Sequence, residues 1–488
     1  MINAHAKAAA SIVVVLSMLL GSLAIIPAAS AETTSISDKL DTEDGPTDVL
    51  GGGDHFFIRF GWDAAFGVVW GTEDNPNNVY FVAIKTRYLG MAQVYDREGN
   101  LVSENNTIKI YTLYAVKLDD MLEFDDVNDN GILPYTRVYE NGNFTGTYMA
   151  GEPLYKKVDM KTAWEASPIT EEGDEEVRTW SFDLTARDLP YELLDSSAQT
   201  PVGDNVLNNL TLTFNLEARM VQVDNATMPQ WRVTVTRGLM GNMWFFGAER
   251  IEDMVVSGKV ITYHVKWDQS IKGWDYDEAN ANPALLMELE ALVGNYIPAG
   301  MATWMEMRMI SYMNEAGRMN YETPSGEATL NQTTNTYTSP RVVSSPRLSF
   351  GGEYTKIGRL EWVSNVTVDG EQDQLHAQIM AGVPIWAVGW RGDLFAGFAC
   401  LAGLTFPGGD EIIHDPTFSS EALIDVDGST IGKFLVLMIG FAAVLAVIAI
   451  IGIVVVAMGK KPAKKTPQTY ERTFSSQPGE WAKYYDKK

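Results

Sequence analysis

Apolar and polar residues alternate along most of the chain between residues 55 and 430. Alternation with a period of two, bounded by Gly, Asn and Asp, is typical of half-buried antiparallel strands. It is clearest in five stretches, at residues 108–118, 210–217, 231–236, 261–267 and 360–368. No long helical pattern competes with it. The pattern therefore predicts an all-β fold for this part of the chain.

One segment, residues 283–293, fits two structures. Its flanks suit a helix, because Asn282 can cap the N-terminus and Gly294 can follow the C-terminus. Its apolar residues also alternate as in a strand, where one face would carry Leu285, Met287 and Leu289. The surrounding strands favour the second interpretation.

A disulfide-free chain outside the cell needs large packed cores, and two β-sandwich-like units would supply them. We place these units at residues 55–255 and 256–430. A flexible acidic leader at residues 32–54 precedes them and ends in three glycines. The stretch at residues 324–346 is rich in Ser, Thr, Asn and Pro and is either a linker or a long loop.

Both ends of the chain carry targeting signals. Residues 1–31 have the pattern of a signal peptide, with Lys7, an apolar run and a small-residue cleavage site at residues 29–31. An uncleaved N-terminal anchor is the alternative. Residues 434–458 contain no charged residue, and as a helix of about 37 Å they would cross a membrane. A buried soluble helix is the alternative for this segment.

A basic tail at residues 459–488 follows the apolar segment, with eight Lys and Arg against three acidic residues. The positive-inside rule places this tail in the cytoplasm. The chain is therefore expected to be a type I single-pass membrane protein with most of its residues outside the cell. The tail either docks a partner or lies near anionic lipid as a stop-transfer flank.

The overall charge narrows the set of partners. The chain has 37 Lys and Arg against 63 Asp and Glu, a net charge of −26. Nucleic acid binding needs clustered basic residues, so this class of function is excluded. A single cysteine excludes a disulfide framework and a Cys-rich zinc site.

Residues 126–132 match the first half of a calcium-binding loop, whose glycine allows a sharp turn. The predicted oxygen ligands are Asp126, Asn128, Asn130 and Ile132. Arg137 stands where a complete EF-hand has Glu, so the missing carboxylates would come from Asp119, Asp120, Glu123 and Asp125. An Asn/Asp/Gly turn between strands is the alternative. A weaker cluster of the same kind comprises Asp275, Asp277, Glu278 and Asn280.

Six Asn-x-Thr triplets lie in the portion expected outside the cell, where N-glycosylation is chemically allowed. Their acceptor residues are Asn105, Asn143, Asn209, Asn225, Asn331 and Asn365. Ordinary Asn-x-Thr sequences in strands and turns are the alternative.

Other reactive side chains have simpler interpretations. Five methionines are spaced so that they would lie on one face of a strand: Met301, Met305, Met307, Met309 and Met313. Their thioethers could bind copper, but packing in the core or at an interface explains them better. Cys400 lies among apolar residues, which indicates an inert buried thiol. The chain lacks the Gly-x-Ser-x-Gly, His-Glu-x-x-His, Walker A and Gly-x-Gly-x-x-Gly patterns of common enzymes.

The densest group of metal-capable side chains near the predicted anchor is Asp410, Glu411, His414 and Asp415, for which a turn is the favoured interpretation. The order Pro407-Gly408-Gly409, then His414-Asp415-Pro416, then an anchor resembles a segment of uncharacterised archaeal single-pass surface proteins. The resemblance covers a short part of the chain. It implies an archaeal envelope setting and no particular activity.

The expected function is a non-enzymatic envelope, adhesion or recognition role, with calcium and glycans as stabilisers. Envelope proteins or glycans are the expected partners, since thirteen Trp offer stacking faces for sugars. One rival is a surface polysaccharide hydrolase, whose carboxylate pair sequence alone cannot reveal. The other rival is a membrane sensor that signals through its tail.

Overall fold

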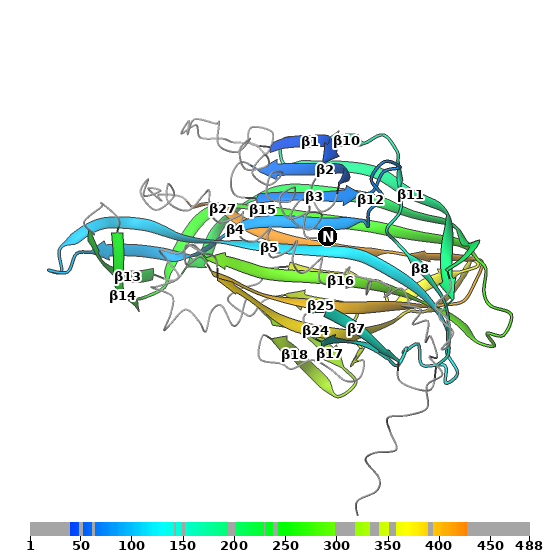
Figure 1. Cartoon of the computed structure of the whole chain (residues 1–488). Helices are drawn as coiled ribbons and strands as arrows, with labels where there is room; N and C mark the ends of the chain where they lie inside the picture. Colours follow the sequence, from blue (N-terminus) through cyan, green and yellow to red (C-terminus); the bar gives the residue numbers. More distant parts are fainter. Residues whose placement is uncertain are drawn as a thin grey trace, which may run out of the picture.

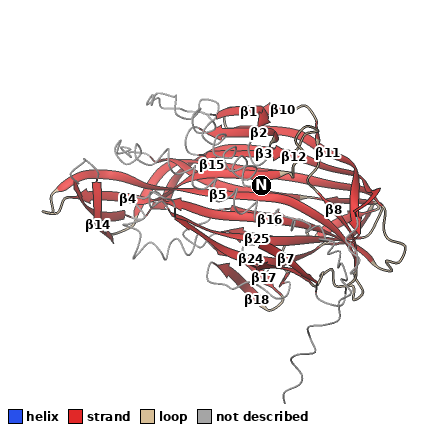
Figure 2. Ribbon diagram, in the orientation of Figure 1, coloured by secondary structure: helices blue, strands red, loops and turns tan. Residues whose placement is uncertain are grey.

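The computed structural model of the chain describes residues 40–47, 52–60, 64–140, 143–148, 152–193, 201–228, 230–237, 243–297, 318–331, 341–350, 358–388 and 394–426. Of the residues described, 76% lie in strands and none in a helix, so the predicted all-β fold is confirmed (Figures 1 and 2). The predicted signal peptide, apolar anchor and basic tail lie outside these residues. So does the methionine stretch at residues 301–313. Within the described part, no helix is long and apolar enough to span a membrane.

The hydrogen-bonded strands fall into two layers. The first layer follows the order β1 (Leu40–Thr47), β2 (Gly53–Phe60), β3 (Ala64–Trp70), β4 (Tyr80–Tyr95), β5 (Leu101–Asp125), β16 (Pro283–Ile297), β25 (Leu394–Pro407), β24 (His376–Val388) and β19 (Arg341–Val343). Its pairings are antiparallel throughout. This layer therefore combines strands from residues 40–125 with strands from residues 283–407.

The second layer begins with β10 (Thr170–Gly173), β11 (Val177–Leu193), β12 (Pro201–Met228) and β15 (Met254–Trp274). β15 then pairs with β26 (Glu411–His414) and β27 (Pro416–Val426). From β26 the layer continues through β22 (Asn365–Val368) to β23 (Glu371–Gln374). From β27 it continues through β21 (Gly358–Trp362), β20 (Arg347–Phe350) and β17 (Arg318–Thr323) to β18 (Gly326–Asn331). Residue 255, the expected boundary between two units, lies inside β15.

Shorter strands complete the structure. β8 (Leu154–Asp159) pairs with β5 and with β11, so it joins the two layers. β9 (Glu165–Ala166) also pairs with β11. β13 (Gln230–Arg237) runs parallel to β4 and forms a hairpin with β14 (Met243–Arg250), and β6 (Tyr135–Glu140) pairs with β7 (Asn143–Tyr148).

Aromatic side chains fill the space between the layers. Phe81 of β4 contacts Phe214 of β12 and Trp267 of β15, with ring centroids 5.4 and 4.7 Å apart. Tyr114 of β5 stacks on Phe418 of β27 at 4.2 Å. These residues belong to one cluster of buried side chains that draws on both layers. The alternating apolar positions of the sequence are therefore the inner faces of a long β-sandwich.

Three segments add detail to the sequence-based expectations. Residues 283–293 form part of the strand β16, which confirms the strand interpretation, because ladders on both sides satisfy its backbone. The stretch at 360–368 contains two strands, interrupted at Val363 and Ser364. Residues 40–47 of the predicted leader form β1, an edge strand whose polar Thr42 and Asp44 are exposed. An edge strand needs a partner on one side only, so its polar composition is tolerated.

Candidate functional site

A β-bulge gathers charged side chains on the outer face of the first layer. Met121 pairs with Met287 and Leu118 pairs with Leu289, so Asp119 and Asp120 together lie opposite Glu288. In a regular strand consecutive side chains point to opposite faces, whereas a bulge places two on one side. Oxygen atoms of these three carboxylates lie within 4.8 Å of one another, and all three residues are buried.

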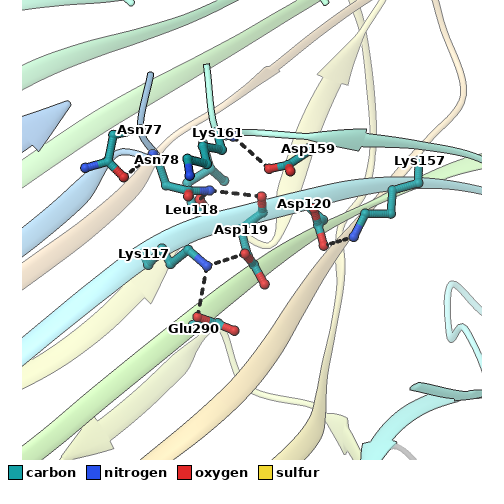
Figure 3. Close-up of polar contacts among 10 residues, drawn as sticks. All are labelled: Asn77, Asn78, Lys117, Leu118, Asp119, Asp120, Lys157, Asp159, Lys161 and Glu290. Carbon is teal, nitrogen blue, oxygen red and sulfur yellow. Dashed lines mark hydrogen bonds and ion pairs between the residues drawn. The ribbon is translucent and has the colours of Figure 1, made fainter. Parts of the chain in front are cut away.

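Two lysines pair with part of this group. We call the whole set the carboxylate–lysine cluster: Lys117, Asp119, Asp120, Lys157, Glu288 and Glu290. The Lys117 ammonium contacts the Asp119 carboxylate and lies 3.1 Å from Oε2 of Glu290 on the neighbouring strand. The Lys157 ammonium of β8 contacts the Asp120 carboxylate (Figure 3). Buried charges are costly unless paired in this way.

Electrostatics keep Lys117 charged. Burial alone would lower the pKa of this lysine, but the carboxylates of Glu290 and Asp119 act in the opposite direction, and its pKa lies above the usual value. Burial also raises the pKa of the neighbouring Tyr80. Lys117 is therefore a fixed positive charge that links β5 to β16.

Asn78 holds the bulged backbone in place. Its side-chain amide donates to the carbonyl oxygens of Leu118 and Asp119, at 2.9 and 3.3 Å (Figure 3). Its own backbone N–H donates to the side-chain oxygen of Asn77 at 3.0 Å. A bulge disrupts the local ladder, and the Asn78 amide supplies a donor to both carbonyl groups there; the Asp119 carbonyl also accepts from the Met160 N–H at 3.1 Å.

The cluster contains residues that sequence reasoning did not select. Glu288, Glu290, Lys117 and Lys157 were missed because the bulge and the pairing of β5 with β16 are invisible in the sequence. One signal was available in the sequence: Glu288 and Glu290 are charged residues that stand between apolar residues of a predicted strand. Three carboxylate oxygens within 4.8 Å are also a donor set that suits a hard divalent cation such as calcium.

The predicted calcium ligands lie in a separate loop between β5 and β6. Asp126 accepts hydrogen bonds from the backbone N–H groups of Asn130 and Gly131, at 3.1 and 2.7 Å. The side-chain oxygen of Asn130 accepts from the N–H of Ile132 at 2.7 Å. These contacts have the geometry of an Asx turn, the alternative considered from the sequence.

Glu152 is the carboxylate that the structure brings to this loop. It accepts from the Val127 N–H at 2.7 Å and from the side-chain amide of Asn128. Burial raises the pKa of Glu152, and the nearby Asp126 and Asp125 carboxylates act in the same direction. Glu152 therefore adds a carboxylate to the loop that contains Asp126 and Asn128, and calcium binding there stays a prediction.

We expect calcium to raise the melting temperature through this loop, and we expect the double substitution Asp126→Ala with Asn128→Ala to reduce that rise. The measurement is the melting temperature with calcium and with chelator. A matched control is Asp96→Ala, which removes an Asx turn at the β4–β5 connection, where Asp96 accepts from the Asn100 N–H at 2.7 Å. An equal calcium-dependent rise in the loop variant would assign the effect to another site.

The other predicted carboxylates serve different contacts. Glu123 accepts from the Trp274 Nε1–H, the Asp277 N–H and the Asn280 amide, at 3.0, 2.8 and 3.0 Å. Asp125 accepts from the Asn282 N–H at 3.1 Å. Both therefore fasten the connection between β15 and β16, which contains the weaker cluster predicted at residues 275–280.

The metal-capable group at residues 410–415 is spread over several contacts. Glu411 pairs with Lys272 at 2.6 Å, and Asp415 lies 3.7 Å from Lys266. His414 is buried on the opposite side of its strand, with Nδ1 and Nε2 each 3.2 Å from an oxygen of Gln269 and Val363. These side chains therefore make ion pairs and hydrogen bonds to neighbouring residues, and they do not converge on one point.

Burial lowers the pKa of His414 to about 4 from its ordinary value of 6.5. Between these pH values the unfolded chain binds a proton that the folded chain does not. The contribution of neutral, buried His414 to the free energy of unfolding is therefore complete above pH 6.5 and is lost as the pH falls toward 4. The size of this contribution is about 3 kcal/mol. We expect His414→Gln to unfold with a weaker pH dependence in chemical denaturation between these values. Parallel curves for the two proteins would contradict this.

The remaining predicted positions are distributed over the surface and core. Among the glycosylation acceptors with described side chains, Asn225 and Asn365 are exposed, whereas Asn209 is half-buried and accepts from the Thr211 hydroxyl. Asn105, Asn143 and Asn331 lie on β5, β7 and β18. Cys400 is buried with Sγ 3.7 Å from the sulfur of Met319, and burial raises its pKa to about 12. Its thiol is therefore unreactive in the folded chain.

Comparison with known protein families, with curated protein sequences and with solved structures finds no match for this chain.

Proposed function

We propose that this chain is a single-pass surface protein whose β-sandwich has a non-enzymatic envelope, adhesion or recognition role outside the cell. The anchor in this proposal is the uncharged segment at residues 434–458, with the basic tail on the cytoplasmic side. Calcium bound in the Asp126 loop and glycans on the exposed Asn225 and Asn365 would stabilise it.

The observation that carries the proposal is that the buried charged residues form ion pairs between neighbouring strands. Lys117 links β5 to β16, and Lys157 links β8 to β5, so the cluster holds strands together. Glu288 and Asp120 have exposed fractions of 0% and 4%. A glycosidase needs its two carboxylates on either side of a bound sugar, and side chains buried to this degree do not reach one.

The shape of the sandwich fits a scaffold. β5 and β12 contain 25 and 28 residues, which corresponds to about 80 to 90 Å of extended chain. Strands in globular domains are usually about five or six residues long. Long strands tied by internal ion pairs suit a protein that projects from a membrane and contacts its neighbours.

The test uses the full-length protein reconstituted into liposomes. We expect light scattering to show that calcium clusters these liposomes, or a glycan panel to show binding with the sugars left intact. Bare liposomes are the control for calcium acting on lipid. Release of new reducing ends from a polysaccharide would favour the hydrolase instead. Absence of both clustering and binding would contradict the proposal.

A further inference from the structure

The carboxylate–lysine cluster contains the three groups needed to form an amide bond between side chains. The ammonium of Lys157 contacts the carboxylate of Asp120, and these residues belong to different strands, β8 and β5. Their side chains are 20% and 5% exposed. A carboxylate oxygen of Glu288 lies within 4.8 Å of one from Asp120. The pair is therefore held in contact, shielded from bulk water and adjacent to a second acid.

We propose that Lys157 and Asp120 form an intramolecular isopeptide bond, with Glu288 as the acid that carries the proton. A proton first passes from the Lys157 ammonium to the Asp120 carboxylate, which leaves a neutral amine and a neutral carboxyl group. Nζ of Lys157 then attacks Cγ of Asp120, forming a C–N bond. The C–O bond to one Asp120 oxygen then breaks. Glu288 takes a proton from the attacking nitrogen and gives one to the leaving oxygen, so one water molecule leaves and Glu288 is regenerated. No oxidant, reductant or activated co-reactant is required.

The arrangement favours this condensation in two ways. Three carboxylates with oxygens this close share protons, because like charges at short range disfavour full ionisation. A proton is therefore available beside Asp120. Holding amine and carboxyl in contact also gives effective concentrations of about 10⁵ M or more for well-oriented groups, which offsets the unfavourable equilibrium of amide formation in water.

Lys157 is a better nucleophile for this reaction than Lys117. Lys117 is shared between Asp119 and Glu290, which stabilise its protonated form. A lysine must lose a proton before its nitrogen can attack a carbonyl carbon, and these two carboxylates hold that proton on Lys117. Asp119 also follows Lys117 by two residues on the same strand, so a bond between them would link nothing new.

The bond would act where the two layers meet. β8 pairs with β5 through Leu122 and Lys157, and with β11 through Lys157 and Glu192. The chain has one cysteine, which is buried, so a disulfide within the chain cannot supply this link. A Lys–Asp amide would give a long sandwich the covalent closure that disulfides give other extracellular proteins.

The test is peptide mass spectrometry of trypsin-digested full-length protein. We expect the peptide 118–137 joined to the peptide 157–161, at their summed mass minus one water, with fragment ions that place the link at Asp120 and Lys157. Recovery of unlinked 118–137 together with 158–161, the product of cleavage after an unmodified Lys157, would overturn the proposal. So would a link at Lys117. This result is independent of the surface role, since clustering of liposomes does not require the bond.

Variants separate the chemistry from a structural effect. We expect Lys157→Arg, which keeps the charge, and Glu288→Gln, which keeps the volume, each to lose the linked peptide. The matched control Lys117→Arg should retain it. Asp120→Asn should form the same amide by releasing ammonia in place of water, with no 158–161 peptide released by cleavage after Lys157. An Asp120→Asn chain that folds, shown by its melting transition, and stays fully unlinked would contradict the assigned attack.

Discussion

Lys117→Met will destabilise the folded protein by about 3 to 5 kcal/mol, the usual cost of removing one partner from a buried ion pair. Lys117 lies 3.1 Å from Glu290 and also contacts Asp119, and all three residues are buried. Methionine replaces the aliphatic part of the lysine side chain at similar length but carries no positive charge. Two carboxylates would then remain in a site of low polarity without this ammonium. The measurement is the free energy of unfolding in urea.

A surface pair provides the control for this substitution. Lys266 contacts Asp268 at 2.7 Å, but its side chain is 43% exposed. Exposed ion pairs contribute about 1 kcal/mol or less, so Lys266→Met should change stability much less than Lys117→Met. Adding Glu290→Gln to Lys117→Met should recover part of the loss, because it removes one of the two carboxylates. Equal effects of the two lysine substitutions would show that Lys117 is not the tie between β5 and β16.

Glu123→Leu will also destabilise the folded protein strongly. Glu123 is buried and accepts three hydrogen bonds from the connection between β15 and β16. Leucine would leave the Trp274 Nε1–H and the Asp277 N–H without this acceptor. Each unsatisfied buried donor costs about 1 to 3 kcal/mol, so we expect a loss of about 4 kcal/mol in the free energy of unfolding.

Hydrogen exchange would locate the effect of Glu123→Leu. The amide hydrogens at residues 275–280 should exchange faster in the variant, because Glu123 accepts hydrogen bonds from this part of the connection. Glu123→Gln keeps one side-chain oxygen as an acceptor and should show a smaller change in both measurements. Unchanged exchange at residues 275–280 would mean that other contacts hold the connection.

The local structure of this protein could be predicted from its sequence because the alternation records which side of each strand faces the core. Leu210, Leu212 and Phe214 alternate with polar residues, and all three are buried in β12. Alternation left residues 283–293 open between helix and strand, and the surrounding strands favoured the strand that is observed. Alternation also did not show the break at Val363, where it continues across two strands that pair with different partners.

The candidate site depended on long-range pairing, which alternation does not encode. Lys117 and Glu290 are separated by 173 residues and meet only because β5 pairs with β16. The bulge that turns Asp119 and Asp120 to one side leaves no mark in the sequence, so a regular strand would have placed them on opposite faces. Glu152 likewise reaches the Asp126 loop from a position 24 residues beyond Asn128.

The most direct test of the proposed surface role is protease treatment of intact cells that make the full chain with a C-terminal epitope tag. We expect external trypsin to remove the sandwich and to leave a short, membrane-bound fragment that carries the tag. Lysed cells should lose the tag as well, because the tail becomes accessible. A full-length tagged chain that resists trypsin in intact cells but is digested after lysis would contradict the surface role.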